Sequence, residues 1–256
     1  MRRTAPSTRS SACGRTAPPS RSRTPSRGSE LSGRAGPQVS DGRGGGRRIV
    51  FWRHGQTLWN VEQRFQGHTD IPLDETGIAQ AERAASLLAS LRPSLIVSSH
   101  LRRAHDTAAA LGGIVGLDVK VDKDLRERGG GEWEGLTRAE IAAGWPVQYA
   151  EWEAPGGEAV TEVADRVVAA TKRWVAQMEE GGLMVIASHG AAIRLGLSRL
   201  LGLPEELWPI LGGLANCSWS VVQEGRKGWR LLEHNAGTLP EPVNSDDKPE
   251  SAPAAT

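Results

Sequence analysis

The sequence is poor in the residues and runs that define several large classes of protein. Its two cysteines, Cys13 and Cys217, lie far apart in 256 residues, so we expect no intramolecular disulfide and no disulfide-built extracellular scaffold. No apolar run reaches the roughly eighteen residues of a membrane span, and no secretory signal precedes the first apolar segment. These absences favour a cytoplasmic protein that has no membrane partner.

Metal-ligating residues are also few. Only six histidines occur, and His100 and His105 are five residues apart, a spacing that does not place two side chains on one helix face. No Cys/His pattern has the spacing of a metal site, and neither a P-loop nor a GxSxG nucleophile motif is present. We therefore expect no metal and no other cofactor.

The two ends of the chain have the composition of disordered tails. Residues 1–46 are rich in Arg, Ser, Pro and Gly and hold nine arginines against two acidic residues, without apolar periodicity. The tail resembles a transit peptide in composition, and a true translation start near Val39 is an alternative. It lacks the interleaved aromatics of a nucleic-acid-binding arm, so we expect no nucleic-acid partner. Residues 240–256 read as a second tail, which leaves 47–239 as one folded domain.

Strand and helix patterns alternate between the tails, which is typical of an α/β protein. We predict strands over 48–52, 94–98, 118–121, 183–187, 216–222 and 229–233. We predict helices over 76–91, 101–113, 137–143, 158–179 and 191–201. A turn at 224–228 would join the last two strands as a hairpin. The expected fold is a three-layer α/β/α sandwich with a mostly parallel six-stranded sheet and an antiparallel edge.

Two histidine–glycine pairs follow predicted strands directly. Arg53-His54-Gly55 ends the first, and His189-Gly190 ends another. Ligands in open parallel sheets bind beyond the carboxyl ends of the strands, so the two pairs are expected to form one site. The arginine is suited to phosphate or carboxylate, and a histidine there is suited to act as base, acid or nucleophile.

Five blocks of sequence strengthen this interpretation. They are RHGQTLWN (53–60), FQG (65–67), SSHLRRAHDTA (98–108), LRERGGGEWEGLT (125–137) and SHGAAIR (188–194). In order and spacing they resemble the histidine phosphatase superfamily, which includes the cofactor-dependent phosphoglycerate mutases. Within it, the closer resemblance is to actinobacterial glucosyl-3-phosphoglycerate phosphatases, carried also by WPILGGLANCSW (208–219). The resemblance implies a phosphoglycerate mutase-like fold, and a homodimer is a family expectation.

The resemblance also implies roles for individual residues. His54 matches the histidine that becomes phosphorylated, while Arg53, Arg103 and His189 would form the positive pocket around the phosphoryl group. Spacing alone leaves Arg102 as a rival to Arg103, and the family pattern selects Arg103. Glu127 would be the general acid and base, with Glu132 and Glu134 as rivals in the same loop. Four further residues are expected to contact the substrate phosphate: Asn60, Gln66, Gly67 and Gly190.

Three further histidines and seven of the nine tryptophans are assigned to other roles. We expect surface or capping positions for His68, His105 and His234. Three tryptophans are expected in the core (Trp52, Trp174 and Trp219), and four are expected near the pocket rim (Trp59, Trp133, Trp145 and Trp152). Aromatic faces at a rim could stack on a sugar, although packing is the commoner role of such residues.

These predictions lead to a metal-independent phosphatase that acts on a small phosphate ester through a phosphohistidine. The resemblance suggests glucosyl-3-phosphoglycerate as the substrate. A phosphoglycerate mutase or a broad-specificity sugar-phosphate phosphatase is the enzyme alternative, although the segment 127–157 looks short beside the capping insertions of mutases. A phospho-ligand binding module without turnover is the non-enzyme alternative. It would have no need of a nucleophile and an acid together.

Overall fold

The computed structural model describes residues 45–239. The two expected tails, 1–46 and 240–256, lie outside the described residues except for Gly45 and Gly46. Within the described part, strands and helices alternate, as the sequence pattern predicts.

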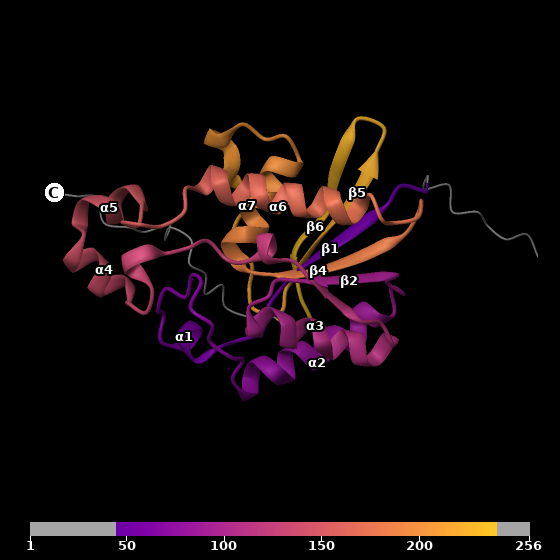
Figure 1. The fold of residues 1–256 in the computed structure, drawn as a ribbon, viewed down its shortest axis with the longest axis horizontal. Helices are drawn as coiled ribbons and strands as arrows, with labels where there is room; N and C mark the ends of the chain where they lie inside the picture. The colour runs from indigo at the N-terminus through magenta and orange to yellow at the C-terminus, as the bar shows by residue number, and fades with distance from the viewer. Residues whose placement is uncertain (1–44, 240–256) are drawn as a thin grey trace, which may run out of the picture. The chain divides into compact units, whose positions relative to one another are not determined.

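Six strands form a single mixed sheet in the order β3-β2-β4-β1-β5-β6 (Figure 1). Their bounds are Arg48–Arg53 (β1), Leu95–Ser98 (β2), Val119–Val121 (β3), Leu183–Ser188 (β4), Trp219–Gly225 (β5) and Gly228–Ala236 (β6). The first four in this order, β3 to β1, pair in parallel, and β5 pairs antiparallel with both β1 and β6. The expected parallel sheet with an antiparallel edge is confirmed.

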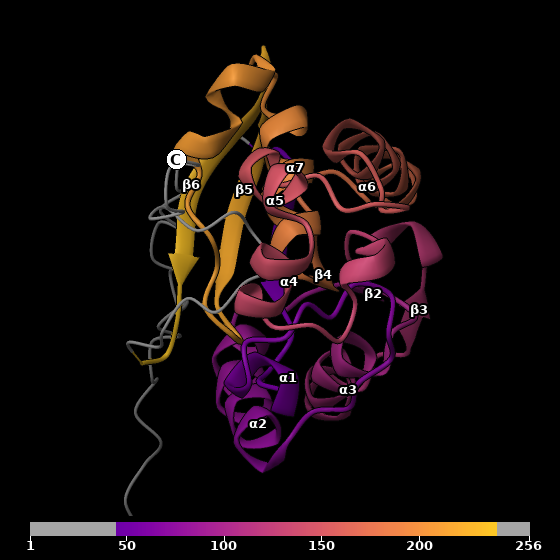
Figure 2. The same cartoon turned by 90° about the vertical axis from the view of Figure 1, so that its left-hand side faces the viewer.

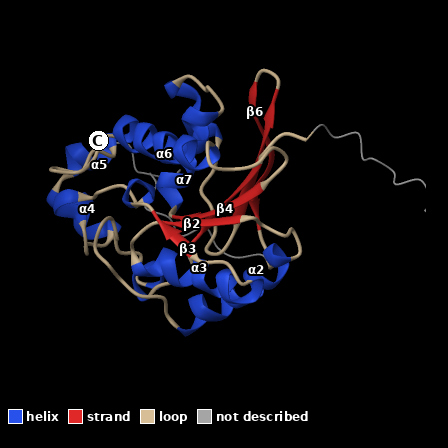
Figure 3. Ribbon diagram, turned by 45° about the vertical axis from the view of Figure 1, so that its right-hand side comes forward, coloured by secondary structure: helices blue, strands red, loops and turns tan. Residues whose placement is uncertain are grey.

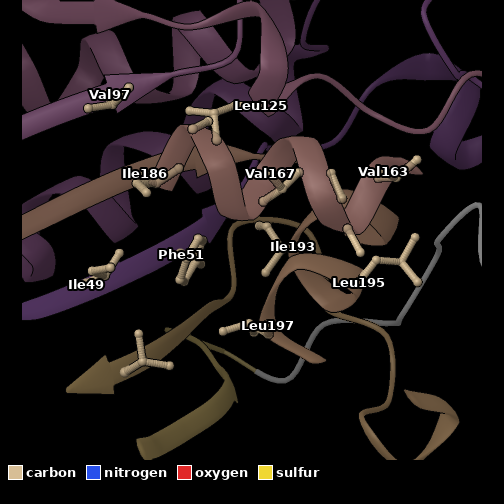
Figure 4. Close-up of a cluster of buried hydrophobic side chains, with 14 of the residues drawn as sticks. Ile49, Phe51, Val97, Leu125, Val163, Val167, Ile186, Ile193, Leu195 and Leu197 are labelled. Carbon is tan, nitrogen blue, oxygen red and sulfur yellow. The ribbon is translucent and has the colours of Figure 1, made fainter. Parts of the chain in front are cut away.

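Helices cover both faces of this sheet (Figure 3). Helices α2 (Glu75–Ala89) and α3 (Arg102–Val115) lie on one face, and α6 (Val160–Val175) and α7 (Gly190–Leu200) lie on the other. Because side chains alternate along a strand, Val50 and Trp52 pack with α2 and α3, while Ile49 and Phe51 pack with α6 and α7 (Figure 4). All four side chains are buried, which explains why β1 reads as a continuous apolar run.

Three shorter helices gather beyond the carboxyl ends of the parallel strands: α1 (Leu58–Val61), α4 (Arg138–Gly144) and α5 (Pro146–Glu151) (Figure 2). A separate small core lies under α4 and α5 and is built from Phe65, Trp133, Ile141 and Trp152. Trp133 and Trp152, expected at a pocket rim, are instead buried in this core. These two tryptophans therefore stabilise the packing of the loops around α4 and α5.

The start of β5 differs from the prediction. The expected strand 216–222 begins only at Trp219, because residues 215–218 form a turn in which Ser218 N–H donates to Ala215 C=O. Cys217 in this turn has a φ of 55°, and its N–H donates to His54 C=O at 3.2 Å. A segment that we expected to extend the sheet therefore bends back over the strand-end histidine.

Five short elements were not predicted. They are α1, α5 and the 3-10 helices η1 (Lys123–Leu125), η2 (Gly131–Trp133) and η3 (Glu205–Ile210). None of them is long enough to show an apolar repeat at helical spacing. The five predicted helices correspond to α2, α3, α4, α6 and α7 and begin and end within a few residues of the expected bounds, except that α6 ends at Val175 rather than at 179.

Candidate active site

The pairing of the strands brings the two histidine–glycine segments together. In the parallel β1–β4 pair, Arg53 is opposite Ser188, so His54 and His189 leave neighbouring strands at the same level. The rings of the two histidines lie 5.2 Å apart between centroids. Both side chains are buried. The structure thus brings together the two histidines that the sequence assigns to one site.

One nitrogen of His54 is held by its own backbone. Nδ1 lies 2.7 Å from the carbonyl oxygen of Gly55, and because a carbonyl only accepts, this nitrogen carries the proton. Nε2 is then the unprotonated nitrogen with a lone pair. Burial, followed by the charges of Arg103 and Arg53, holds the pKa of His54 well below its ordinary value. A neutral imidazole with a fixed tautomer has the form required of a nucleophile.

His189 is held through the opposite nitrogen. Its Nε2 lies 2.9 Å from Ser99 Oγ, and Ser99 Oγ already accepts from Leu101 N–H. We assign the serine hydroxyl as the donor to Nε2, which leaves the ring proton on Nδ1. Among the described residues, the buried Nδ1 of His189 has no hydrogen-bond partner. Burial and then Arg103 hold the pKa of His189 well below its ordinary value.

Two guanidinium groups lie close to the histidine pair and are almost wholly buried. Arg103 donates to the carbonyls of Thr69 at 2.9 Å and Gly67 at 2.8 Å, and Arg53 donates to the carbonyl of Leu214. Backbone carbonyls orient these groups. The rival Arg102 is exposed, so burial separates two residues that spacing alone could not.

Glu127 lies at the start of α7. Its Oε1 accepts from Ala192 N–H at 2.9 Å and from Arg128 N–H at 2.8 Å, and its Oε2 accepts from Ala191 N–H at 3.2 Å. The carboxylate thus satisfies N–H groups that have no partner within the helix. Because α7 follows His189 directly, Ala191 and Ala192, which bind Glu127, lie only two and three residues after that histidine.

A partly buried polar network supports the segment that carries Glu127. Arg166 of α6 donates to the backbone carbonyls of Asp124, Arg126 and Glu127 at 2.7–2.8 Å. It also bonds to both carboxylate oxygens of Glu158, which in turn accepts from the N–H of Gly129. The sequence patterns did not identify Arg166 or Glu158. Neither lies in a block that resembles a known motif.

His68 is exposed, as expected for a surface residue, and it also belongs to the same network. Its Nε2 lies 3.0 Å from Glu127 C=O and 3.2 Å from a carboxylate oxygen of Glu158. Burial alone would raise the pKa of Glu158, but hydrogen bonds from His68 and Arg166 outweigh burial and lower it well below the usual range. Glu158 is therefore a fixed negative charge behind the Glu127 loop.

Asn60 and Gln66 are buried beside the same strand ends. Asn60 Oδ1 accepts from Thr57 N–H at 3.1 Å and from Asn216 Nδ2 at 3.2 Å. The amide NH₂ of Asn60 therefore points away from Thr57 N–H and Asn216. The Thr57 hydroxyl donates to Oε1 of Gln66. Asn216, which the sequence analysis did not single out, also donates to His54 C=O at 3.1 Å. It therefore joins the predicted amide to the backbone of the histidine.

The loop carboxylates and glycines have distinct positions. Glu134 accepts from the N–H groups of His68, Thr69 and Gly130, so it ties two loops together, whereas Glu132 is exposed. Gly67, with a φ of 50°, holds Arg103 through its carbonyl and leaves no room for a Cβ beside Glu134. Gly190 is the buried first residue of α7.

A close contact between two glycines fixes the loop after β1. A Cβ on Gly55 would overlap the backbone of Gly77, and a Cβ on Gly77 would overlap the backbone of Gln56. Gln56 also donates through its side chain to Asp74, the N-cap residue of α2. The nucleophile candidate is thus anchored to α2 by backbone packing.

Two findings concern other kinds of site. Among residues 45–239, no three His, Cys, Asp or Glu side chains are grouped so that they could hold a metal ion. None of the helices in that range is long and apolar enough to span a membrane.

Comparison with known proteins gives a consistent picture. A family model described as "Histidine phosphatase superfamily (branch 1)" matches residues 49–237. The chain is 44% identical over 189 residues to a protein of Mycobacterium tuberculosis strain H37Rv named glucosyl-3-phosphoglycerate phosphatase, covering 69% of this chain and 85% of that one. It is 36% identical over 191 residues to a probable phosphoglycerate mutase of Salmonella paratyphi C, covering 71% and 87%.

Solved structures are similar as well. The mycobacterial glucosyl-3-phosphoglycerate phosphatase in complex with VO3 matches with a TM-score of 0.72 and 43% identity, over 75% of this chain and all of the other. The residues that the family model matches, 49–237, include the loops that carry both histidines.

Proposed function

The chain belongs to the histidine phosphatase superfamily and is a phosphatase; from this premise we propose that it hydrolyses a small phosphomonoester through a phosphohistidine on His54, with glucosyl-3-phosphoglycerate as the substrate. The observation that carries the proposal is the pair of buried, neutral histidines with opposite free nitrogens, 5.2 Å apart, beside two buried arginines. The substrate is suggested by the relatives at 43–44% identity that bear that name.

In the first step, Nε2 of His54 attacks phosphorus and the bond from phosphorus to the ester oxygen breaks. Glu127 gives its proton to the departing oxygen. Arg53, Arg103 and the Nδ1–H of His189 stabilise the charge on the phosphoryl oxygens, together with the amide NH₂ of Asn60. Gln66, Gly67 and Gly190 complete the proposed phosphate pocket.

In the second step, Glu127 takes a proton from water, and the water oxygen attacks the phosphohistidine. The bond from phosphorus to Nε2 breaks, which restores neutral His54 and releases phosphate. Water is the acceptor in a phosphatase, whereas a mutase returns the phosphoryl group to the substrate. Because the charge of the phosphate is met by the two arginines and His189, no metal ion is required in this scheme.

A phosphate-release screen of the full chain tests the proposal. The substrates are glucosyl-3-phosphoglycerate, 3-phosphoglycerate, other sugar phosphates and p-nitrophenyl phosphate, each with and without EDTA. We expect the highest kcat/KM for glucosyl-3-phosphoglycerate and no effect of EDTA. Conversion of 3-phosphoglycerate to 2-phosphoglycerate without release of phosphate would instead identify a mutase.

A further inference from the structure

Arg166 of α6 and Glu158, which lies just before α6, form an ion pair behind the loop that carries Glu127. Their side chains are 11% and 18% exposed, and Nη2 of the arginine lies 2.7 Å from Oε2 of the glutamate. A largely buried arginine whose charge is met by a carboxylate is held in one orientation. It can therefore fix whatever else its remaining N–H groups contact.

All five N–H groups of the Arg166 guanidinium have acceptors within the protein. Nη1 donates to the carbonyls of Asp124 and Arg126 at 2.8 and 2.7 Å, and Nη2 donates to the carbonyl of Glu127 at 2.8 Å. The N–H of Nε and the second N–H of Nη2 donate to Glu158. Because an arginine has no more than five donors, Arg166 is suited to hold the loop rather than to bind a ligand.

Glu158 holds the other side of the same loop. Its Oε2 accepts from Gly129 N–H at 2.8 Å, and its own backbone N–H donates to Gly129 C=O at 3.0 Å. The ion pair thus fixes the backbone before Glu127, at Glu127 and after it. The carboxylate of Glu127 is thereby presented to the first N–H groups of α7, at Ala191 and Ala192.

We propose that Arg166 is a positioning residue for the reaction, because it fixes the backbone of Glu127 and so sets where that carboxyl group meets the oxygen of the departing group. The inference rests on the proposed function, in which Glu127 is the acid. Arg53 and Arg103 are oriented by carbonyls outside the 124–129 loop. Loss of the Arg166 contacts should therefore impair proton transfer and leave the phosphate pocket in place.

The test separates the position of Arg166 from its charge. Burial, Arg103 and His54 lower the pKa of His189, and the charge of Arg166 adds to them, so a neutral replacement would change two things at once. Arg166→Lys keeps the positive charge and replaces five donors in a planar fork by three on one atom.

Arg173 provides the matched control. It lies on the same helix and is paired with the carboxylates of Asp122 and Asp124, at 3.0 and 2.7 Å. Arg173→Lys therefore alters an ion pair to the same segment and leaves the bonds of Arg166 to the backbone carbonyls intact.

Each full-length protein is assayed with phenyl phosphate and with p-nitrophenyl phosphate, which are similar in size but differ in how much the leaving oxygen needs a proton. Because kcat/KM covers the steps up to release of the phenol, it reports on phosphorylation of the enzyme. For Arg166→Lys we expect kcat/KM to fall roughly tenfold to a hundredfold on phenyl phosphate, the cost of a misplaced catalytic group. The loss on p-nitrophenyl phosphate should be much smaller, and Arg173→Lys should change neither value.

A double-variant cycle shows whether the effect passes through Glu127. In the Glu127→Gln background, which has no proton to transfer, Arg166→Lys should cause no further loss on phenyl phosphate. If circular dichroism shows that Arg166→Lys is poorly folded, Glu158→Gln replaces it, since the amide keeps an acceptor for Gly129 N–H. This variant should show the same selective loss on phenyl phosphate, by a smaller factor. Equal losses on both substrates, no loss on either, or a full additional loss in the Glu127→Gln background overturns the inference.

The single variants also separate this inference from the proposed function. If Glu127→Gln loses most on phenyl phosphate and Arg166→Lys does not, the positioning role is wrong and the proposed acid stands. If Glu127→Gln loses the same factor on both substrates, Glu127 is not the acid, and the positioning role assigned to Arg166 is wrong with it.

Discussion

The two strand-end histidines occupy equivalent places in the fold and yet present different nitrogens to the site. His54 is bound through Nδ1 to its own following carbonyl, and His189 is bound through Nε2 to the hydroxyl of Ser99. Both carry their proton on Nδ1 in this arrangement. In His54 that proton is bound by the Gly55 carbonyl, whereas the Nδ1 of His189 has no hydrogen-bond partner among the described residues. In the proposed mechanism, the same residue type thus serves as the nucleophile on one strand and as a hydrogen-bond donor on its neighbour.

The largest expected effect is the loss of the nucleophile. His54→Ala should lower kcat by roughly 10⁴-fold or more, as removal of the nucleophile does in other covalent enzymes. The wild type should form an acid-labile, base-stable phosphoryl label with radioactive substrate, and the variant should form none. Circular dichroism checks that the variant is folded. Turnover at the wild-type rate would show that the two histidines do not differ in the way proposed.

Glu127→Gln should cost roughly 10²- to 10⁴-fold in kcat, the usual contribution of general acid–base catalysis. The amide keeps hydrogen-bonding capacity at the start of α7 but cannot transfer a proton. The loss in the phosphorylation step should shrink with p-nitrophenyl phosphate, because its leaving group departs without protonation. The burst of p-nitrophenol measures that step. An equal loss on both substrates would point to another acid, and Glu132→Gln is the exposed control.

His189→Ala is expected to be milder than His54→Ala, because it removes a donor and leaves the nucleophile. The loss of one donor to developing charge costs roughly 10²- to 10³-fold. In contrast to His54→Ala, this variant should still accumulate the phosphoryl label, at a slower rate. If His189→Ala forms no label after long incubation while it remains folded, His189 has a part in the covalent step.

Ser99→Ala tests the tautomer of His189. Without the hydroxyl, Nε2 loses its donor and the proton is no longer directed to Nδ1. A neutral hydrogen bond contributes about 0.5–1.5 kcal/mol, so kcat/KM should fall by roughly three- to tenfold. Ser98→Ala is the control, since Ser98 Oγ bonds to a carbonyl and not to a histidine. A loss in Ser98→Ala as large as that in Ser99→Ala would contradict the assignment.

The smallest effect concerns stability against pH. Both histidines have folded-state pKa values well below 6.5, so the unfolded chain binds their protons first. The free energy of unfolding should therefore fall as pH is lowered through 6.5, by up to about 1.4 kcal/mol per unit for each histidine, and level off below the folded pKa. Urea unfolding at several pH values measures this, and His189→Gln should reduce the slope.

The sequence predicts the strands that carry the site residues better than it predicts the side chains that hold those residues in place. Two apolar runs that each end in His-Gly placed both histidines at the carboxyl ends of strands of one sheet, and the α/β fold is confirmed. The order of the strands, which makes β1 and β4 neighbours, was not predicted. The roles assigned to the site residues remain predictions, although the structure places them together. Family patterns were needed for Glu127 and to choose Arg103 over Arg102.

The supporting residues were not predictable because each acts across a long stretch of chain. Asn216 contacts a carbonyl 162 residues away, and Arg166 contacts the Glu127 backbone 39 residues away. The residues that flank Asn216 and Arg166 in the sequence form no motif that would indicate these contacts. The tryptophans were misplaced for the same reason. Their position near a predicted loop in the sequence does not show whether they lie at the rim of a pocket or in the small core to which Trp133 and Trp152 belong.

The contact between Gly55 and Gly77 has a consequence for thermal behaviour. Because α2 packs on the sheet core through Ala81, Ala84 and Leu88, the loop after β1 cannot open without detaching this helix. Catalysis should therefore persist on heating until the whole domain melts, so that the temperature of inactivation and the calorimetric Tm coincide. An enzyme whose nucleophile lay on a free loop would become inactive well before its fold was lost.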